Sequence, residues 1–428
     1  MLRPLDFMPT DVHPSLMVDR TELREELTAD ILRYLGRRDP RASGTWAVTG
    51  DKGSGKTILT RAVLEDVREK RSGSTVVVTV DCRERQSWRE LLSQLGYGLM
   101  TELLELRKIE RDVVSESLLA EAQLIDELAR LDRAELRILH EHAQSFKAHL
   151  KLVAATSELL SSLRVDLGFD MGVDVRRVKG LSGMRTFDED RLSRALCGLC
   201  QDIRAAGLGV VVYLDNIDEL RHEYHDVESR RRIRRDVEGL LRLREAPIAL
   251  VLNMRTYFSR VLPRQLPTPP LRLGPLPEQD LLGILDKRVR HESPEVQRGF
   301  EQPEAREAVE RLAKLAPTAL AFLTWVHYLY RRDYLALERL EQGFSRYVYS
   351  AYSTVDENQV RRLMDEFDTP TTSIDRERLL AACEGNEEIL HKLEDLQVVL
   401  PGDFWSPQTY TLDPLFQTFH LALVGSGR

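Results

Sequence analysis

The chain has 428 residues, of which 42% are hydrophobic and 30% charged, and its formal net charge is −8. This length predicts about two to four domains with buried cores, and the slight acidity does not indicate a nucleic-acid-binding protein. Four cysteines are too few for a disulfide framework, and we interpret Cys197 and Cys200 as core residues. Because no apolar stretch has the length of a signal peptide core or a membrane span, we expect a cytoplasmic protein without a membrane partner.

The strongest signal is a glycine-rich segment at residues 50–57, the phosphate loop, which reads Gly-Asp-Lys-Gly-Ser-Gly-Lys-Thr. It follows a short apolar run and precedes a helical pattern, as the phosphate-binding pattern G-x-x-x-x-G-K-[ST] requires. Backbone N–H groups of such a loop surround a phosphate, while the lysine neutralises charge and the hydroxyl residue binds Mg²⁺. We therefore predict an ATP/ADP and Mg²⁺ site. Its predicted nucleotide-binding residues are Gly50, Asp51, Lys52, Gly53, Ser54, Gly55, Lys56, Thr57 and Ile58.

A second apolar run, residues 210–214, ends at Asp215. Such a run is typical of a parallel strand buried on both faces, and ligands of α/β proteins gather where parallel strands end. We therefore predict that Asp215 and Thr57 hold the Mg²⁺ ion together. The polar residues that follow the strand are candidates for catalysis: Asn216, Asp218 and Glu219.

A third apolar run, residues 248–252, ends in two more polar residues, Asn253 and Arg255. At the end of a strand beside the phosphate loop, Asn253 would sense the γ-phosphate. Arg255 would stabilise the phosphate in its own subunit or reach the nucleotide of a neighbouring one. Together the three runs predict an α/β fold whose parallel sheet carries nucleotide across the edge where its strands end.

These elements, in this order, resemble the AAA+ ATPases, and within them the branch shared by origin-recognition-type initiators and STAND-type signalling ATPases. The phosphate loop and Asp215 resemble the Walker A and Walker B elements, and Asn253 and Arg255 fall in the sensor-1 region. Residues 7–22 are similar to the adenine-side segment of that branch, which implies a nucleotide contact for Arg20. Residues 273–277 resemble the start of the family's helical lid.

The chain departs from the family pattern at two positions. AAA+ ATPases usually carry Glu directly after the Walker B Asp, where it polarises the attacking water, but this chain has Asn216, which cannot act as a base. Asp218 or Glu219 can take that role. Residues 315–320 lack the sensor-2 arginine of initiators and contain Pro317, closer to the STAND pattern. We therefore expect an ATPase with slow hydrolysis and leave the branch open.

The predicted organisation is a P-loop NTPase core of the AAA+ type at residues 44–270, after a segment at 1–43 that flanks the nucleotide site. A helical lid at 271–350 and a winged-helix-like domain at 351–428 follow. Residues 103–186 form a predicted insertion, because they combine a long helical run without glycine or proline and a period-two alternation at 165–175. The insertion is either a surface for a partner or a structural elaboration.

The predicted winged helix comprises helices at residues 360–367, 375–383 and 386–396, followed by a hairpin. Residues 356–428 hold 6 Lys and Arg against 14 Asp and Glu, a balance that repels a phosphate backbone. The leading interpretation is therefore an ATP-controlled switch that forms a homo-oligomer or binds a protein partner through the insertion and the winged helix. One alternative is a DNA-binding initiator or loader that acts in replication, transposition or phage defence. In another, the nucleotide is a static structural ligand.

Overall fold

A computed structural model gives the fold of the chain. It describes residues 20–37, 43–82, 88–109, 114–130, 189–218, 242–256, 269–316, 318–340, 373–395, 398–402 and 408–412, with single residues and pairs between some of these ranges. Residues 1–19, Glu219 and residues 131–188, which include the alternating run of the predicted insertion, lie outside the described residues.

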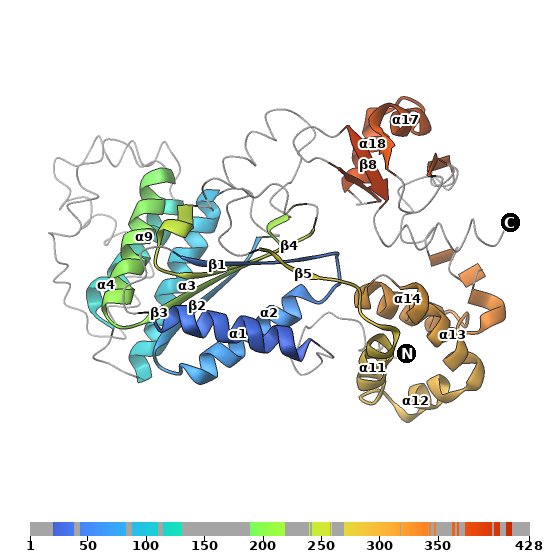
Figure 1. The fold of residues 1–428 in the computed structure, drawn as a ribbon, viewed down its shortest axis with the longest axis horizontal. Coiled ribbons are helices and arrows are strands. Elements are labelled where there is room, and N and C mark those ends of the chain that lie inside the picture. Colours follow the sequence, from blue (N-terminus) through green and yellow to red (C-terminus); the bar gives the residue numbers. More distant parts are fainter. Residues whose placement is uncertain are drawn as a thin grey trace.

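The core is a parallel sheet in which the strands follow the order β2-β3-β4-β1-β5 (Figure 1). Three of them, β1, β3 and β4, are the strands predicted from the sequence. These three strands are parallel, and β4 lies between β1 and β3. Their carboxyl ends therefore meet at one edge of the sheet, called here the carboxyl edge. The strands are β1 (Gly44–Gly50), β2 (Thr75–Asp81), β3 (Gly209–Asp215), β4 (Ala249–Met254) and β5 (Leu271–Leu273).

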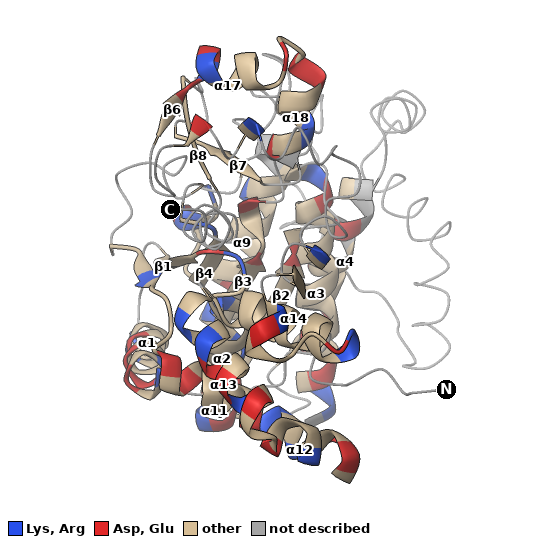
Figure 2. Ribbon diagram, turned by 90° about the vertical axis from the view of Figure 1, so that its right-hand side faces the viewer, with Lys and Arg blue, Asp and Glu red and all other residues tan. Residues whose placement is uncertain are grey.

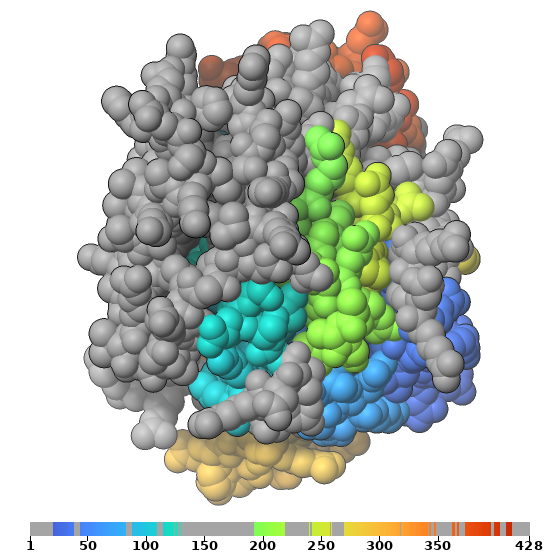
Figure 3. Space-filling model, turned by 90° about the vertical axis from the view of Figure 1, so that its left-hand side faces the viewer, coloured from blue at the N-terminus to red at the C-terminus, as the bar shows by residue number. Residues whose placement is uncertain are grey.

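Helices cover both faces of the sheet, which explains the unbroken valine runs of its strands. On one face, Val77, Val211 and Tyr213 pack with apolar residues of α1 (Thr21–Leu35) and α2 (Lys56–Lys70). On the other, the alternate residues of the same strands, such as Val210 and Val212, pack against a second helical layer. That layer consists of α3 (Trp88–Ile109), α4 (Glu116–Arg130) and α9 (Glu189–Ala205), which contact one another. In Figure 3 the cyan surface of the first two helices adjoins the green surface of α9.

The described part of the predicted insertion belongs to this second layer. The predicted start at residue 103 falls inside α3, and buried side chains of α4 join the same core cluster as those of α3 and α9. Cys197 and Cys200 of α9 are buried in this cluster, as interpreted from the sequence. Burial raises the pKa of Cys197 to about 11, so its thiol stays protonated at neutral pH.

Four helices follow the sheet and form the region predicted as a lid. The lid was predicted to begin at residue 271, but residues 271–273 form the edge strand β5 beside β1, and the first of the four helices begins at Glu278. Phe322, Trp325 and Val326 of the last helix are buried in the centre of this region. Its helices are α11 (Glu278–Val289), α12 (Pro294–Glu301), α13 (Pro303–Leu315) and α14 (Ala319–Arg331). Short 3₁₀ helices occupy Leu243–Glu245 before β4 and Leu337–Arg339 after α14.

The C-terminal region has the helices and hairpin strands expected of a winged helix. It contains α17 (Arg376–Ala382), α18 (Glu387–Asp395), β7 (Val399–Pro401) and β8 (Thr409–Leu412). A further strand not predicted from the sequence, β6 (Ile374–Asp375), completes an antiparallel sheet of order β6-β8-β7. Most of the first predicted helix, residues 360–367, lies outside the described residues. The predicted fold class, a P-loop α/β core with helical and winged-helix elements after it, is thus confirmed. Among the described helices, none combines the length and the apolarity that crossing a bilayer requires.

The close approach of α3 and α4 gives a test of whether α4 belongs to the core. A Cβ atom at Gly96 would lie 2.8 Å from the backbone nitrogen of Asp126 and 3.0 Å from the carbonyl oxygen of Ala122. Because backbone atoms cannot move aside cheaply, we expect Gly96→Ala to lower the free energy of unfolding by about 1–3 kcal/mol. Urea denaturation followed by circular dichroism measures this change.

Gly198→Ala is the matched control, since Gly198 lies in α9 of the same layer and a Cβ there would meet nothing within 4 Å. Alanine forms helix better than glycine, so this variant should gain up to about 1 kcal/mol. If Gly96→Ala also gained stability, the packing of α4 on α3 described above would be wrong.

Candidate nucleotide-binding site

The phosphate loop joins β1 to α2 and depends on glycines at two positions. Gly53 and Gly55 have φ angles of 80° and 93°, a region that residues with a side chain rarely adopt. A Cβ at Gly53 would also lie 2.2 Å from Cβ of Leu320 in α14, so the loop packs closely against the lid. The expected strand, loop and helix are present at residues 44–70.

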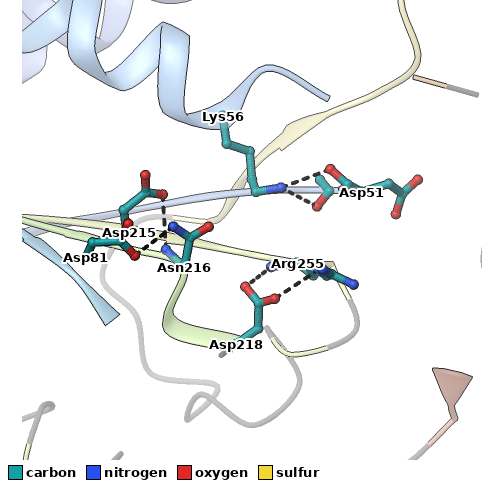
Figure 4. Close-up of polar contacts among 8 residues, drawn as sticks. Asp51, Lys56, Asp81, Asp215, Asn216, Asp218 and Arg255 are labelled. Atoms are coloured by element: carbon teal, nitrogen blue, oxygen red, sulfur yellow. Dashed lines mark hydrogen bonds and ion pairs between the residues drawn. The ribbon is translucent and has the colours of Figure 1, made fainter. Parts of the chain in front are cut away.

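Lys56 opens α2 and turns its side chain back over the loop (Figure 4). Its Nζ donates to the carbonyl oxygens of Gly50 and Asp51, both at 2.9 Å. Burial lowers the pKa of Lys56, while the carboxylates of Asp218 and Asp215 favour its charged form. The ammonium group is therefore held at the centre of the loop, where a phosphate would meet it.

The hydroxyl group of Ser54 tests whether this loop fits a phosphate. Its Oγ atom is buried and has no hydrogen-bond partner in the described part of the chain. Buried polar groups rarely remain unpaired, because losing water without a replacement costs about 1–3 kcal/mol. A phosphate oxygen seated in the loop would accept this hydrogen bond.

Thr57 and Asp215 form the predicted metal-binding pair. Thr57 Oγ1 donates to Asp215 Oδ2 at 2.9 Å, so the start of α2 and the end of β3 are in direct contact. Hydroxyl and carboxylate oxygens are ligands that Mg²⁺ accepts, and this ion usually takes its remaining ligands from phosphates and water. Among the described residues, no group of three or more histidines, cysteines or carboxylates could by itself hold a metal ion.

Asn253 fills the space between these two elements, because β4 lies between β1 and β3. It is fully buried, and its amide nitrogen donates to the Tyr213 hydroxyl at 2.7 Å and to Asp215 Oδ1 at 3.3 Å. Its amide oxygen accepts from Thr60 Oγ1 of α2 at 3.1 Å. Asn253 therefore braces Asp215 against α2, and its role as a γ-phosphate sensor stays a prediction.

Arg255 and Asp218 form a buried ion pair beyond the end of β4. Arg255 Nε lies 3.0 Å from Asp218 Oδ2, and the backbone nitrogen of Arg255 donates to Asp218 Oδ1 at 3.0 Å. Their side chains are only 6% and 4% exposed. To contact a neighbouring subunit, as one of its predicted roles requires, Arg255 would have to leave this pair. Asp218, a predicted water-activating acid, has both carboxylate oxygens turned to Arg255.

Asn216 directly follows Asp215 and takes a left-handed backbone conformation with a φ of 55°. Its backbone nitrogen donates to Asp215 Oδ1 at 3.0 Å, and its amide nitrogen donates to Asp81 Oδ1 at 3.0 Å. Asp81 was not predicted as a site residue. The signal was present, because residues 76–80 are apolar apart from Thr79 and end in an acid, like the run before Asp215.

The remaining predicted contacts lie at the border of the site. Arg20 precedes α1, and its Nη2 donates to the carbonyl oxygen of Gly274, between β5 and the lid. Ile58 is half-buried in the first turn of α2, and Lys52 is exposed on the loop. Their contacts with nucleotide, like those of the loop itself, stay predictions.

The fold and the loop together define a P-loop ATPase core. A comparison with protein-family models indicates which class of P-loop ATPase it resembles. Residues 23–230 match the family described as the AAA ATPase domain. This match confirms the resemblance to AAA+ P-loop ATPases that was predicted from the sequence. A comparison with curated proteins gives no match.

Among solved structures, the chain is similar to the Aeropyrum pernix Orc1 protein in complex with DNA, at 14% identity and a TM-score of 0.45 over 98% of this chain and 96% of that one. The Aeropyrum pernix ORC2 protein in its ADP form gives 13% identity and a TM-score of 0.45 over 98% and 96%. For Cdc6p from Pyrobaculum aerophilum the values are 13% and 0.40 over 98% and 97%. At TM-scores below 0.5, the choice between the initiator and STAND branches stays a prediction.

The ion pair of Arg255 and Asp218 can be tested through stability. We expect Arg255→Ala to lower the free energy of unfolding by about 3–5 kcal/mol, because it leaves a buried carboxylate without its partner. Removing both charges in Arg255→Ala/Asp218→Ala should cost less than the sum of the two single changes. Urea denaturation of the four proteins measures the coupling, and additive losses would show that the pair does not exist in solution.

Proposed function

We propose that this protein binds ATP with Mg²⁺ at the phosphate loop, hydrolyses it slowly, and uses its nucleotide state to control assembly or partner binding. The observation that carries this proposal is the 2.9 Å hydrogen bond between Thr57 and Asp215. It brings together the two oxygen ligands that an ATP-bound Mg²⁺ ion needs, one from the loop and one from the sheet.

Each residue of the loop has a defined task in this function. Lys56 neutralises phosphate charge. The buried Ser54 hydroxyl donates a hydrogen bond to a phosphate oxygen. The backbone N–H groups at the start of α2 favour an anion in the same place. Mg²⁺, when bound by Thr57 and Asp215, would withdraw charge from the phosphate oxygens during transfer.

Slow turnover follows from the two polar residues after strand β3, Asn216 and Asp218. Asn216 occupies the position directly after Asp215 and has no basic form at neutral pH. Asp218 is neutralised by Arg255 in a buried pair. Neither residue is placed to take a proton from water without rearrangement, so nucleotide binding, rather than rapid turnover, is the functional event.

The lid is positioned to respond to that event. The N-cap residue of α14, Thr318, and the following Leu320 lie against Gly53, and Arg20 joins the segment before the lid to the start of α1. A phosphate that enters the loop changes the surroundings of these contacts. A ligand shifts such an equilibrium by its difference in affinity for the two lid positions.

The charge of the C-terminal region favours a protein partner or a second copy of the chain. Helix α18 carries four acidic residues and one lysine, and Figure 2 shows acidic positions on both α17 and α18. Nearby arginines are already paired with carboxylates: Arg362 with Glu384, Arg376 with Glu387, and Arg378 with Glu366. We place the partner contact here and in the predicted insertion.

A DNA-binding initiator or loader is the second candidate, because the helices and hairpin of the C-terminal region have the arrangement of a winged helix. DNA contact through α18 would require phosphates to approach an acidic surface, which costs free energy. This candidate therefore needs basic residues elsewhere in the chain.

Steady-state ATP hydrolysis tests the function directly. We expect the wild type to turn over below about 1 s⁻¹, slower than a typical enzyme. Lys56→Ala should bind ATP at least about 100-fold more weakly, because it removes a half-buried cation that would make charge-assisted hydrogen bonds to phosphate. Isothermal titration with ATP and Mg²⁺ measures affinity, and phosphate release measures turnover.

Both proteins are assayed with and without duplex DNA at low and moderate salt. Turnover that DNA stimulates in the wild type but not in Lys56→Ala would favour the initiator over the protein-facing switch. Undiminished ATP affinity of Lys56→Ala would refute the site, and co-purified nucleotide that never turns over would indicate a static structural ligand.

A further inference from the structure

Asp81 lies at the carboxyl edge and has no task in the nucleotide site described so far. It ends β2, and its Cα atom is the register partner of Asp215 in the adjacent strand β3. Adjacent parallel strands run about 4.8 Å apart, so the two carboxylates start from neighbouring positions. Asp215 is buried, whereas Asp81 is only half-buried and therefore within reach of water.

Asp215 and Asp218, the acids at the ends of β3 and of the segment after it, are turned to other groups of the site. Asp215 accepts hydrogen bonds from Thr57 Oγ1 and from the backbone nitrogen of Asn216. Asp218 is turned to Arg255, and the Asp51 side chain points away from Asn216 in Figure 4. Asp81 is half-buried, accepts a hydrogen bond from Asn216 and lies beside Asp215 in the sheet, a place from which its carboxylate can exchange a proton with water.

Asn216 connects Asp81 to the nucleotide site, because it donates hydrogen bonds to both Asp81 and Asp215. Its amide nitrogen must face the Asp81 carboxylate, because the opposite orientation would place two acceptor oxygens against each other. The amide oxygen therefore points away from Asp81, toward the side on which Lys56 lies in Figure 4. Within the described part of the chain this oxygen accepts no hydrogen bond. It can accept one from a water molecule.

We propose that Asp81 is the proton acceptor for the attacking water and that Asn216 orients this water, an inference that rests on the proposed ATPase function. The water donates one hydrogen bond to Asn216 Oδ1 and the other to the Asp81 carboxylate. Its oxygen forms a bond to the γ-phosphorus while the bond from phosphorus to the β,γ-bridging oxygen breaks. The electron pair of the broken bond leaves with ADP, and the water proton passes to Asp81, which later releases it to solvent.

The use of two residues, one to orient the water and one to accept its proton, also accounts for slow hydrolysis. A single Glu after the Walker B Asp would both orient and deprotonate the water, whereas here Asn216 orients it and a shorter acid on the neighbouring strand takes the proton. Since β2 is separated from β1 by β3 and β4, the Asp81 carboxylate approaches the phosphates from the far end of the edge.

The test is single-turnover hydrolysis of γ-labelled ATP with protein in excess, together with the Kd for ATP and Mg²⁺ from isothermal titration. We expect Asp81→Asn to slow hydrolysis by about 100-fold or more, the usual contribution of a general base, with Kd changed by less than about twofold. Asn216→Ala should slow it similarly. The double variant should be less than about threefold slower than Asp81→Asn, because the two residues act on one water.

Two further variants separate chemistry from folding. Asp81→Glu keeps a carboxylate and should retain a rate within about tenfold of the wild type. Thr79→Ser, at an exposed position of the same strand, should leave rate and affinity unchanged. Thermal melting of each variant confirms that it folds.

Each outcome decides the inference. Hydrolysis by Asp81→Asn at the wild-type rate would overturn it, as would a loss of ATP affinity large enough to explain the slower rate. A wild type that binds ATP but never hydrolyses it would overturn the role of Asp81 while leaving nucleotide binding intact. Failure of the wild type to bind ATP, or normal binding by Lys56→Ala, would instead refute the proposed function itself.

Discussion

The hydrogen bond from Thr57 to Asp215 is the contact on which the arrangement of the site depends, because it spans the sheet from the P-loop helix to a strand that is not adjacent to β1. The intervening strand β4 brings Asn253 into the gap, where it pairs with both sides. In a buried site, each of these groups would carry a desolvation cost without its partners. The network is therefore satisfied as a unit, and its hydrogen bonds fix the position of the Asp215 carboxylate.

The elements at the centre of the site could be predicted because their signals are local. The glycine pattern of residues 50–57, the apolar run ending at Asp215 and the run ending at Asn253 each specify an element and its end without reference to the rest of the chain. Strand β2 carries the same kind of signal and ends in Asp81, but no motif marks it, so its acid was missed. Strand β5 is only three residues long, too short for a period to show.

What the sequence does not contain is the pairing of side chains that are distant along the chain. Arg255 and Asp218 were each predicted to act on phosphate or water, yet they bind each other, because β3 and β4 are neighbours in the sheet. The extent of the predicted insertion likewise depends on contacts between segments that are distant along the chain. Absence of glycine and proline after residue 99 indicated helices, but the shared core cluster and the close approach at Gly96 are what show that α4 packs on α3 as part of the core.

The phosphate loop also contacts the lid, where the proposed nucleotide switch would act. Gly53 must lack a side chain for two independent reasons, its positive φ angle and the proximity of Leu320, so one position serves both the loop and the packing of α14. In the proposed function, a phosphate bound in the loop would act on α14 through the backbone of Gly53. A shift of the loop on phosphate binding would then reach α14 directly, and the close packing of the lid's apolar core would transmit it through the helix. Because the apolar core of the lid also includes Leu379 and Tyr410 of the C-terminal region, the path continues to the surface on which a partner is proposed to bind.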